Sequence, residues 1–239
     1  QSVDHIDPFV DLYKIGSGDI TWIEMIEYIA RKGKPVLLAT GASNIGEVQI
    51  AMAALTKLTG KIVLMQCNTS YTGSLENFNY VQLRVLDTYR AMYPNTVLGL
   101  SDHTPGHAAV LGAVALGARV IEKHFTDDNG REGPDHQFAL DPQAWREMVL
   151  RTRELERALG TGNKIVEPNE RDTVVLQQRA IRAARDLQAG EVVNRSDLHI
   201  LRPAPAGCIK PNQLDQVVAG KLRNNVKAGD IVRWSDLEG

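Results

Sequence analysis

Cysteine is scarce in this sequence of 239 residues, which contains only Cys67 and Cys208. The two lie far apart and form neither a C-x-x-C pair nor a metal-binding spacing, which is typical of a protein of the reducing cytoplasm. No stretch approaches the ~20 consecutive apolar residues that a membrane-spanning helix requires. The first residues carry neither the basic cluster nor the apolar stretch of a signal peptide. We therefore expect a cytoplasmic protein without a membrane partner.

An excess of charge of one sign is also missing. The 27 Lys and Arg residues are nearly balanced by 29 Asp and Glu residues, and the formal net charge is −2. Basic residues are interspersed with acidic ones along the chain, so we expect no nucleic-acid partner. With 43% apolar residues, the length is sufficient for one large α/β domain or two modest ones.

Five short apolar runs alternate with amphipathic stretches up to residue 160, and this pattern is typical of parallel βα units. Four of the runs are continuously apolar, as expected for strands that helices cover. The expected strands are Leu12–Ile15, Val36–Ala39, Ile62–Gln66, Val97–Leu100 and Arg119–Lys123.

Helix signals stand between the expected strands. Asn44 and Glu47 predict a capping box at the start of a helix. Asp141-Pro142 predicts an N-cap followed by proline at the first helical position, and Thr104-Pro105 predicts the same arrangement after the fourth strand. The sequence therefore predicts five βα units.

Polar side chains follow several expected strands, and their placement favours one of two folds. A doubly wound sheet gathers its chemistry at one switch point, whereas a (β/α)8 barrel uses the carboxyl ends of many strands. No G-x-G-x-x-G motif follows the first strand. The pattern favours an α/β protein with a (β/α)8 TIM barrel, of which five βα units are visible. The polar groups are Lys14 and Ser17, Thr40, Asn68 to Tyr71, Ser101 to His103, and Glu122 with His124.

The composition changes after residue 162. We expect residues 1–162 to form the barrel units, residues 163–178 an exposed linker, and residues 179–239 a small β-rich domain. In that domain Ala189–Leu198 recurs as Ala228–Leu237, and each copy predicts a turn, a short strand and a capped helical turn. Two copies indicate pseudo-twofold symmetry and exclude a solenoid, which needs at least three.

His103 and His124 are the leading candidates for metal binding. Each follows a strand, and consecutive strands of a barrel are neighbours ~4.8 Å apart, so the two imidazoles can converge on one ion. Imidazole is a common ligand of divalent transition metals, and water or substrate oxygen would fill the remaining positions. The alternative is two hydrogen-bonded histidines at a barrel rim. His107 has the i, i+4 spacing to His103, but Pro105 places His103 before the helix, which argues against His107 as a ligand.

A second candidate site begins at Lys14, which leaves a strand and precedes glycines and Ser17. Such a segment can bind a phosphate or an oxyanion, although similar loops are also common without a ligand. Asp135, in the rigid loop Gly133–His136, can accept a bond from a sugar hydroxyl or can simply stabilise a turn. Tyr71 can contact substrate or can be an ordinary interfacial tyrosine.

Four ordered motifs of this chain resemble those of the sialic acid (N-acetylneuraminate) synthase family. The C-terminal repeat with Leu201-Arg-Pro203 resembles that family's antifreeze-like (SAF) domain, a β-clip fold, so the resemblance runs nearly end to end. Family members begin with three further βα units, which implies that this chain lacks the first three barrel strands and is inactive alone. The four motifs are Lys14-Ile-Gly-Ser-Gly18, Leu100-Ser-Asp-His-Thr104, Ile121-Glu-Lys-His-Phe-Thr126 and Gly133-Pro-Asp135.

The resemblance implies roles for the residues at the strand ends. His103 and His124 match a pair of ligands for a divalent metal, usually Mn²⁺, with Mg²⁺ or Co²⁺ as alternatives. Lys14, Ser17 and Ser101 match residues that hold the carboxylate and phosphate of phosphoenolpyruvate. Lys14 and the two histidines are therefore the expected catalytic residues.

The resemblance extends to the sugar and to a partner subunit. Tyr71 and Asp135 match positions that contact the sugar. Arg202 matches an arginine that the swapped SAF domain of a homodimer places over the partner's active site. The family often has Cys-Thr-Ser-x-Tyr where this chain has Cys67-Asn-Thr-Ser-Tyr71, so the substrate-binding role falls on Thr69 or on Asn68.

The implied function is metal-dependent condensation of phosphoenolpyruvate with N-acetylmannosamine, or a related amino sugar, to a nonulosonic acid and phosphate. Legionaminic or pseudaminic acid synthases, which use 6-deoxy diacetamido sugars, are alternatives. An octulosonate-type condensing barrel is a further alternative, which the SAF repeat disfavours. A non-catalytic sugar-binding protein that uses the SAF domain is an alternative of a different class. The intact His103/His124 and Lys14/Ser17 sets argue against it.

Overall fold

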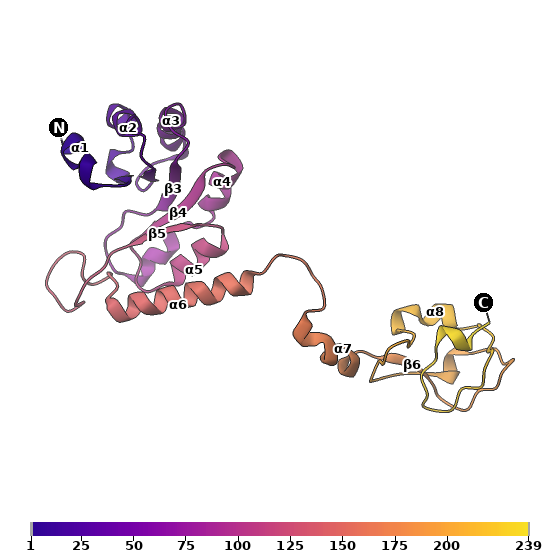
Figure 1. Cartoon of the computed structure of the whole chain (residues 1–239). Coiled ribbons are helices and arrows are strands. Elements are labelled where there is room, and N and C mark those ends of the chain that lie inside the picture. Colours follow the sequence, from indigo (N-terminus) through magenta and orange to yellow (C-terminus); the bar gives the residue numbers. More distant parts are fainter. Residues whose placement is uncertain (1, 239) are drawn as a thin grey trace. The chain divides into compact units, whose positions relative to one another are not determined.

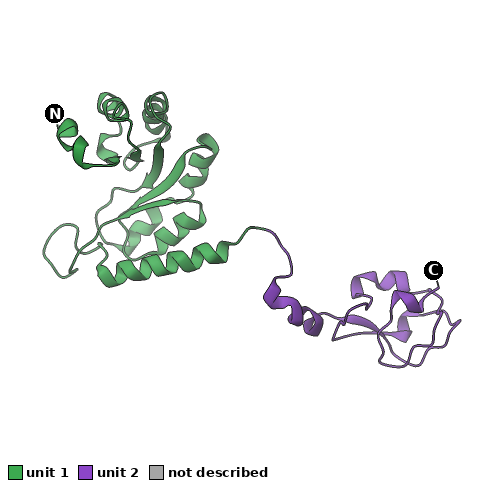
Figure 2. Ribbon diagram, in the orientation of Figure 1, with its two compact units in different colours: residues 1–162 green, residues 163–239 purple. Residues whose placement is uncertain are grey.

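The computed structural model describes residues 2–238, which form two compact units divided between residues 162 and 163 (Figure 2). The expected linker, residues 163–178, belongs to the second unit and contains a 3-10 turn and a short helix. Each unit has its own hydrophobic core.

A five-stranded sheet of parallel strands, in the order of the chain, forms the centre of the first unit. Each strand pairs with the next, so that Lys14 is opposite Leu37 and Ser101 is opposite Glu122. The five expected strands are confirmed, with ends shifted by one or two residues. The strands are β1 (Tyr13–Ile15), β2 (Val36–Ala39), β3 (Ile62–Cys67), β4 (Val97–Asp102) and β5 (Val120–Lys123).

The sheet is strongly curved, as one ion pair between its two edge strands shows. In a flat sheet β1 and β5 would lie about 19 Å apart, because neighbouring strands are ~4.8 Å apart. Lys14 Nζ, from β1, nevertheless lies 2.8 Å from Glu122 Oε2, from β5. The sheet therefore curls around an interior into which both side chains project. This is the arrangement of five consecutive units of a (β/α)8 barrel, as expected.

The helices of the first unit cover the outer face of the curved sheet (Figure 1). Apolar side chains from the strands and from the helices that follow them are fully buried together, among them Ile26, Leu38, Met52 and Leu64. In the described part of the chain no helix combines the length and the apolar character that crossing a membrane requires. The helices are α1 (Ser2–Ile6), α2 (Ile23–Ala30), α3 (Ile45–Thr56), α4 (Val85–Met92), α5 (Ala108–Ala115) and α6 (Pro142–Leu159).

Two of the three predicted helix starts are confirmed. The Asn44 side chain accepts bonds from the backbone N–H groups of residues 46 and 47, and the Glu47 carboxylate accepts one from Asn44 N, which completes the capping box of α3. Asp141 caps α6, with proline at the first helical position.

The start predicted at Thr104-Pro105 is wrong. Helix α5 begins at Ala108, with His107 as its N-cap residue. Thr104 does not cap this helix because its hydroxyl and its backbone N–H both bond to the Asp102 carboxylate.

The second unit contains β6 (Ala180–Ala183) and β7 (Leu198–Leu201), which pair in antiparallel fashion, and the short helices α7 (Arg171–Gln177) and α8 (Leu214–Val217). Each copy of the repeat has a glycine with positive φ, at Gly190 and Gly229, and a 3-10 turn that ends at its Ser-Asp pair. The predicted turns are thus confirmed. The predicted short strands are wrong, because residues 191–193 and 230–232 form only isolated bridges with their neighbours.

Gly99 lies in β4 where the neighbouring strands leave no space for a side chain. A Cβ at this position of β4 would lie 2.8 Å from the Val120 carbonyl oxygen and 2.9 Å from Met65 Cγ, and a backbone oxygen cannot move aside cheaply. We expect Gly99→Ala to lower the free energy of unfolding of the first unit by about 1–3 kcal/mol. Urea denaturation followed by the fluorescence of Trp22 and Trp145 measures this.

Gly60→Ala is the matched control for Gly99→Ala. No atom lies within 4 Å of a Cβ at Gly60, and its backbone does not have a positive φ. We expect this variant to unfold at nearly the same urea concentration as the parent. Equal midpoints for the two variants would contradict the tight packing of β4 against β3 and β5.

Candidate active site

The carboxyl ends of the barrel strands gather polar side chains that are withdrawn from solvent. Parallel strands present their carboxyl ends at the same edge of a sheet, so residues distant in sequence meet there. Buried among them are Ser17 after β1, Ser101 in β4 and His103 after β4. The curvature of the sheet brings side chains of the first and last of these strands together, as the ion pair between Lys14 and Glu122 shows.

His103 and His124 lie next to each other, as the sequence predicts. Each is the first residue after its strand, and Asp102 and Lys123, which precede them, are opposite each other in the β4–β5 register. The two ring centroids are 5.1 Å apart, and the ring planes are inclined by 61°. His103 is only 6% exposed, whereas the His124 side chain is 29% exposed.

Each imidazole has a partner at its Nδ1 atom. His103 Nδ1 lies 2.7 Å from the carbonyl oxygen of Asn68, which can only accept, so Nδ1 carries the proton. His124 Nδ1 lies 3.5 Å from Asp135 Oδ2. Histidine ligands of metal ions usually have such a carbonyl or carboxylate partner, which orients the ring and leaves Nε2 for the metal.

The electrostatic environment keeps His103 neutral. Burial lowers its pKa below the ordinary value, the hydrogen bond to Asn68 opposes that shift, and the proximity of His124 adds to it. A neutral imidazole is the form that binds a metal ion.

The two histidines fit a divalent ion that keeps open coordination positions. Among residues 2–238 no group of three or more His, Cys, Asp or Glu side chains is placed to hold a metal ion. The protein would therefore supply two ligands, and water or substrate oxygen would supply the rest. His107 is the N-cap residue of α5, in line with the argument against its being a ligand.

Two aromatic rings, those of Tyr71 and Phe138, contact the histidines. The Tyr71 ring centroid is 4.3 Å from that of His103 and 5.9 Å from that of His124. Phe138 lies on another side, 5.0 Å from His124, and it is almost completely buried. Tyr71 is 52% exposed, so it forms the solvent-facing side of this cluster.

Lys14, Ser17, Ser101 and Cys67 form the second part of the site. Ser17 Oγ accepts a 2.9 Å hydrogen bond from the backbone N–H of Gly41. Burial raises the pKa of the Cys67 thiol, while hydrogen bonds with the Ser17 and Ser101 side chains oppose the rise. Cys67 Sγ is also 4.0 Å from His103 Nδ1, which joins this part of the site to the histidines.

Gly41 leaves the space in which these side chains meet. A Cβ there would lie 2.5 Å from the Thr69 methyl carbon, 2.9 Å from Ser17 Oγ and 3.0 Å from Cys67 Sγ. Thr69 therefore lies beside Ser17. Asn68, the alternative, binds the Tyr80 carbonyl through its side-chain amide and is thereby held outside this group.

Arg202 belongs to the second unit, where its Nε donates a hydrogen bond to the Gln177 carbonyl. Asp135 lies beside His124 in the first unit.

Sequence reasoning missed Phe138, Cys67 and the partner of Lys14. Glu122 was visible as a polar residue near a strand end, and the alternation of β5 places it on the face opposite Ile121. Its ion pair with Lys14 depends on the curvature of the sheet and has no signal in the sequence.

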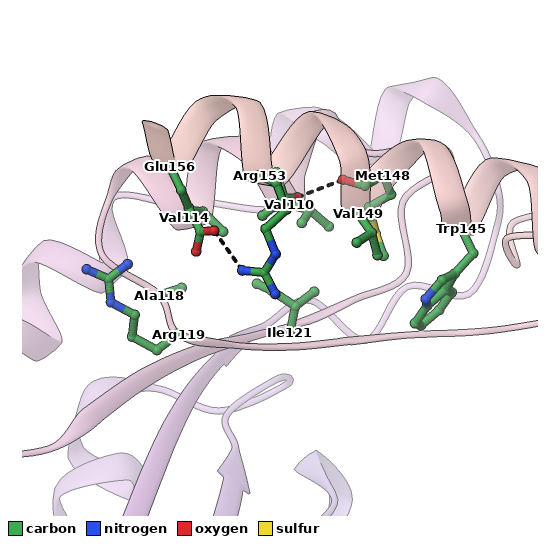
Figure 3. A pocket seen from close by; sticks show the side chains of 11 residues that line it. Val110, Val114, Ala118, Arg119, Ile121, Trp145, Met148, Val149, Arg153 and Glu156 are labelled. Carbon is green, nitrogen blue, oxygen red and sulfur yellow. Dashed lines mark hydrogen bonds and ion pairs between the residues drawn. The ribbon is translucent and has the colours of Figure 1, made fainter. Parts of the chain in front are cut away.

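A cavity of about 230 Å³ between α5, β5 and α6 is a different feature (Figure 3). Its walls are mostly apolar, with Val110, Ile121, Trp145 and Met148 among them, and the Arg153–Glu156 ion pair lies at its edge. It belongs to the packing of helices against the outer face of the sheet and contains no group of the site.

Comparisons with known proteins agree with the fold. The NeuB family model matches residues 1–164, and the SAF domain model matches residues 178–238. An uncharacterized protein of Methanocaldococcus jannaschii is 40% identical over 96% of this chain and 67% of its own length. The N,N'-diacetyllegionaminic acid synthase of Legionella pneumophila is 34% identical over 100% of this chain and 67% of its own length.

A solved structure agrees as well. The N-acetylneuraminic acid (sialic acid) synthetase of Leptospira borgpetersenii has a TM-score of 0.63 and 30% identity over 70% of this chain and 57% of that chain. Fold and relatives thus define the class, which is the family of nonulosonic acid synthases, and these relatives are enzymes. This chain belongs to the NeuB family and carries a SAF domain. It spans about two thirds of the length of the curated relatives above.

The lowered pKa of His103 predicts a pH dependence. Between that lowered pKa and the ordinary value of about 6.5, the unfolded chain binds a proton that the folded chain does not. The free energy of unfolding should therefore rise with pH through this window, and it should lose this contribution as the pH falls.

The His103→Gln variant should show a flatter dependence between pH 5 and 7, whereas His199→Gln, in the second unit, should follow the parent. Urea denaturation at a series of pH values measures the slopes. Equal slopes for the parent and His103→Gln would contradict the assignment.

Proposed function

We propose that this protein is a nonulosonic acid synthase, which condenses phosphoenolpyruvate with N-acetylmannosamine or a related amino sugar and releases phosphate. The observation that carries the proposal is the pair of adjacent imidazoles, joined through Cys67 to the Lys14, Ser17 and Ser101 group. In this proposal the histidines bind the metal ion and the neighbouring group binds the anion, so that the anion and the carbonyl that it attacks come together.

His103 and His124 would hold the divalent ion through their Nε2 atoms, and Mn²⁺ is the ion that we propose. When bound, such an ion supplies Lewis acidity, which polarises the aldehyde oxygen of the open-chain sugar. The hydrogen bond to the Asn68 carbonyl orients the His103 ring for this role, and the Asp135 carboxylate lies 3.5 Å from His124 Nδ1.

The residues of the neighbouring group bind phosphoenolpyruvate. The Lys14 ammonium group and the hydroxyls of Ser17 and Ser101 offer positive charge and donors for its carboxylate and phosphate, and Thr69 borders them. Glu122 holds the Lys14 side chain in the pocket through the 2.8 Å ion pair.

In this proposal Tyr71 and Asp135 contact the sugar. Tyr71 forms the solvent-facing side of the cluster, and the second carboxylate oxygen of Asp135 can accept a bond from a sugar hydroxyl, since the residue is half exposed. Both residues lie within reach of a sugar whose aldehyde is directed at the histidines.

We further propose a homodimer in which the SAF domain of one subunit supplies Arg202 to the site of the other. The hydrogen bond from Arg202 Nε to the Gln177 carbonyl restricts the guanidinium group and leaves its terminal nitrogens for a ligand. Such a pre-oriented arginine suits an acyl oxygen or a carboxylate of the substrate.

The first prediction of this proposal concerns phosphate release. Because the chain matches 67% of the length of the Methanocaldococcus protein, a chimera that joins it to the unmatched remainder of that protein is assayed beside the chain alone. We expect the chimera to release phosphate from phosphoenolpyruvate only when both an amino sugar and Mn²⁺ are present. A chelator should abolish the release, and added Mn²⁺ should restore it.

Variants of the chimera assign the roles. We expect His124→Ala to lower kcat/KM by more than roughly 100-fold, because even the second-shell partners of metal ligands are worth 10–100-fold. His199→Gln should leave kcat/KM unchanged. Sugar binding without phosphate release in a folded chimera would instead favour the non-catalytic, sugar-binding alternative.

A panel of sugars decides the substrate. Relatives that are 34% and 33% identical are N,N'-diacetyllegionaminic acid synthases, and the structural relative above is an N-acetylneuraminic acid synthetase. N-acetylmannosamine and the 6-deoxy diacetamido sugars are therefore offered in parallel, and kcat/KM for each is compared. Turnover of none of them would exclude this proposal.

A further inference from the structure

A buried ion pair lies directly beside the two histidines. Lys123 Nζ is 2.7 Å from Asp102 Oδ2, and both side chains are 1% exposed. Burial of two charges is costly, and a well-packed apolar pair of similar volume often gives equal or greater stability. The stability of the fold alone therefore does not account for these residues.

The Asp102 carboxylate closes a turn whose central residue is His103. Asp102 Oδ1 accepts hydrogen bonds from the Thr104 backbone N–H at 3.0 Å and from the Thr104 hydroxyl at 2.9 Å. An Asx turn of this kind fixes the backbone of the residue that it encloses. The chain at His103 is thus held by side-chain contacts on both sides.

Lys123 ties this turn to the strand that carries His124. Its ammonium group donates to Asp102 Oδ2 at 2.7 Å and to the Thr104 carbonyl oxygen at 2.5 Å, so it binds both ends of the turn. Asp102 and Lys123 are opposite each other in the β4–β5 register, and each immediately precedes a histidine. Because successive side chains of a strand alternate between its faces, the pair lies behind the two imidazoles.

We propose that Asp102, Thr104 and Lys123 are positioning residues, a clamp that sets the separation and the direction of the His103 and His124 rings. They do not touch the substrate or the metal. They act through the backbone at the ends of β4 and β5, where a small shift of either strand would change the distance between the two rings. As far as it concerns metal binding, this inference rests on the proposed function.

The test removes both charges at once. Asp102→Asn/Lys123→Met keeps the approximate volumes and leaves no unpaired buried charge. Arg151→Met/Glu154→Gln, which breaks an exposed ion pair of 2.9 Å on α6, is the matched control. For each protein we measure the dissociation constant for Mn²⁺, the urea midpoint, and, without metal, the nuclear Overhauser effects between the ring protons of His103 and His124.

We expect the double variant to bind Mn²⁺ about 10–100-fold more weakly than the parent, the range found when partners of metal ligands are removed. Its ring-to-ring Overhauser effects should weaken, while its urea midpoint stays close to that of the parent. The control should match the parent in all three measurements. A folded double variant with unchanged Mn²⁺ affinity and unchanged Overhauser effects would overturn the proposal.

Two further results are interpreted as follows: a parent protein that binds no Mn²⁺, and a double variant that does not fold. If the parent binds no Mn²⁺, the proposed function fails, and the Overhauser effects alone decide whether the clamp positions the rings. If the double variant does not fold, Thr104→Val takes its place, because it keeps the ion pair and removes only the hydroxyl contact. Thr104→Val should weaken Mn²⁺ binding and the ring-to-ring Overhauser effects, but by less than is expected of the double variant. A folded Thr104→Val protein that matches the parent in both measurements would overturn the proposal.

Discussion

The parallel register between β4 and β5 is the constraint on which the candidate site depends. It sets Ser101 opposite Glu122 and Asp102 opposite Lys123, and the next residue on each strand is a histidine. Backbone hydrogen bonds fix this register, and it brings the two ring centroids within 5.1 Å of each other. A slip of one residue would turn every side chain of β5 to the other face of the sheet and would remove His124 from the site.

The curvature of the sheet brings together residues of strands that are not neighbours. Neighbouring strands bring the histidines together, but Lys14 belongs to β1, at the other edge of the sheet. Only the curled sheet allows its ion pair with Glu122 at 2.8 Å. Cys67, on the middle strand β3, then contacts both halves of the site, since its thiol meets Ser17, Ser101 and His103.

Residue 68 contributes to the site through its backbone carbonyl, which accepts the hydrogen bond from His103 Nδ1. The side-chain amide of Asn68 binds the Tyr80 carbonyl instead. The methyl group of the neighbouring Thr69 lies against Gly41 beside Ser17.

The sequence by itself determined the five strands, the caps at Asn44 and Asp141 and the positions of His103 and His124 at strand ends. These features depend on neighbours within a few residues, through apolar patterning and local hydrogen bonds. Only the tertiary structure decided that Thr104 bonds to Asp102 instead of capping α5, that Lys14 pairs with Glu122 and that Phe138 lies against His124. Each of these contacts either joins different elements or competes with a local alternative. Whether such a contact forms depends on how the whole sheet pairs and curls, which no short stretch of sequence encodes.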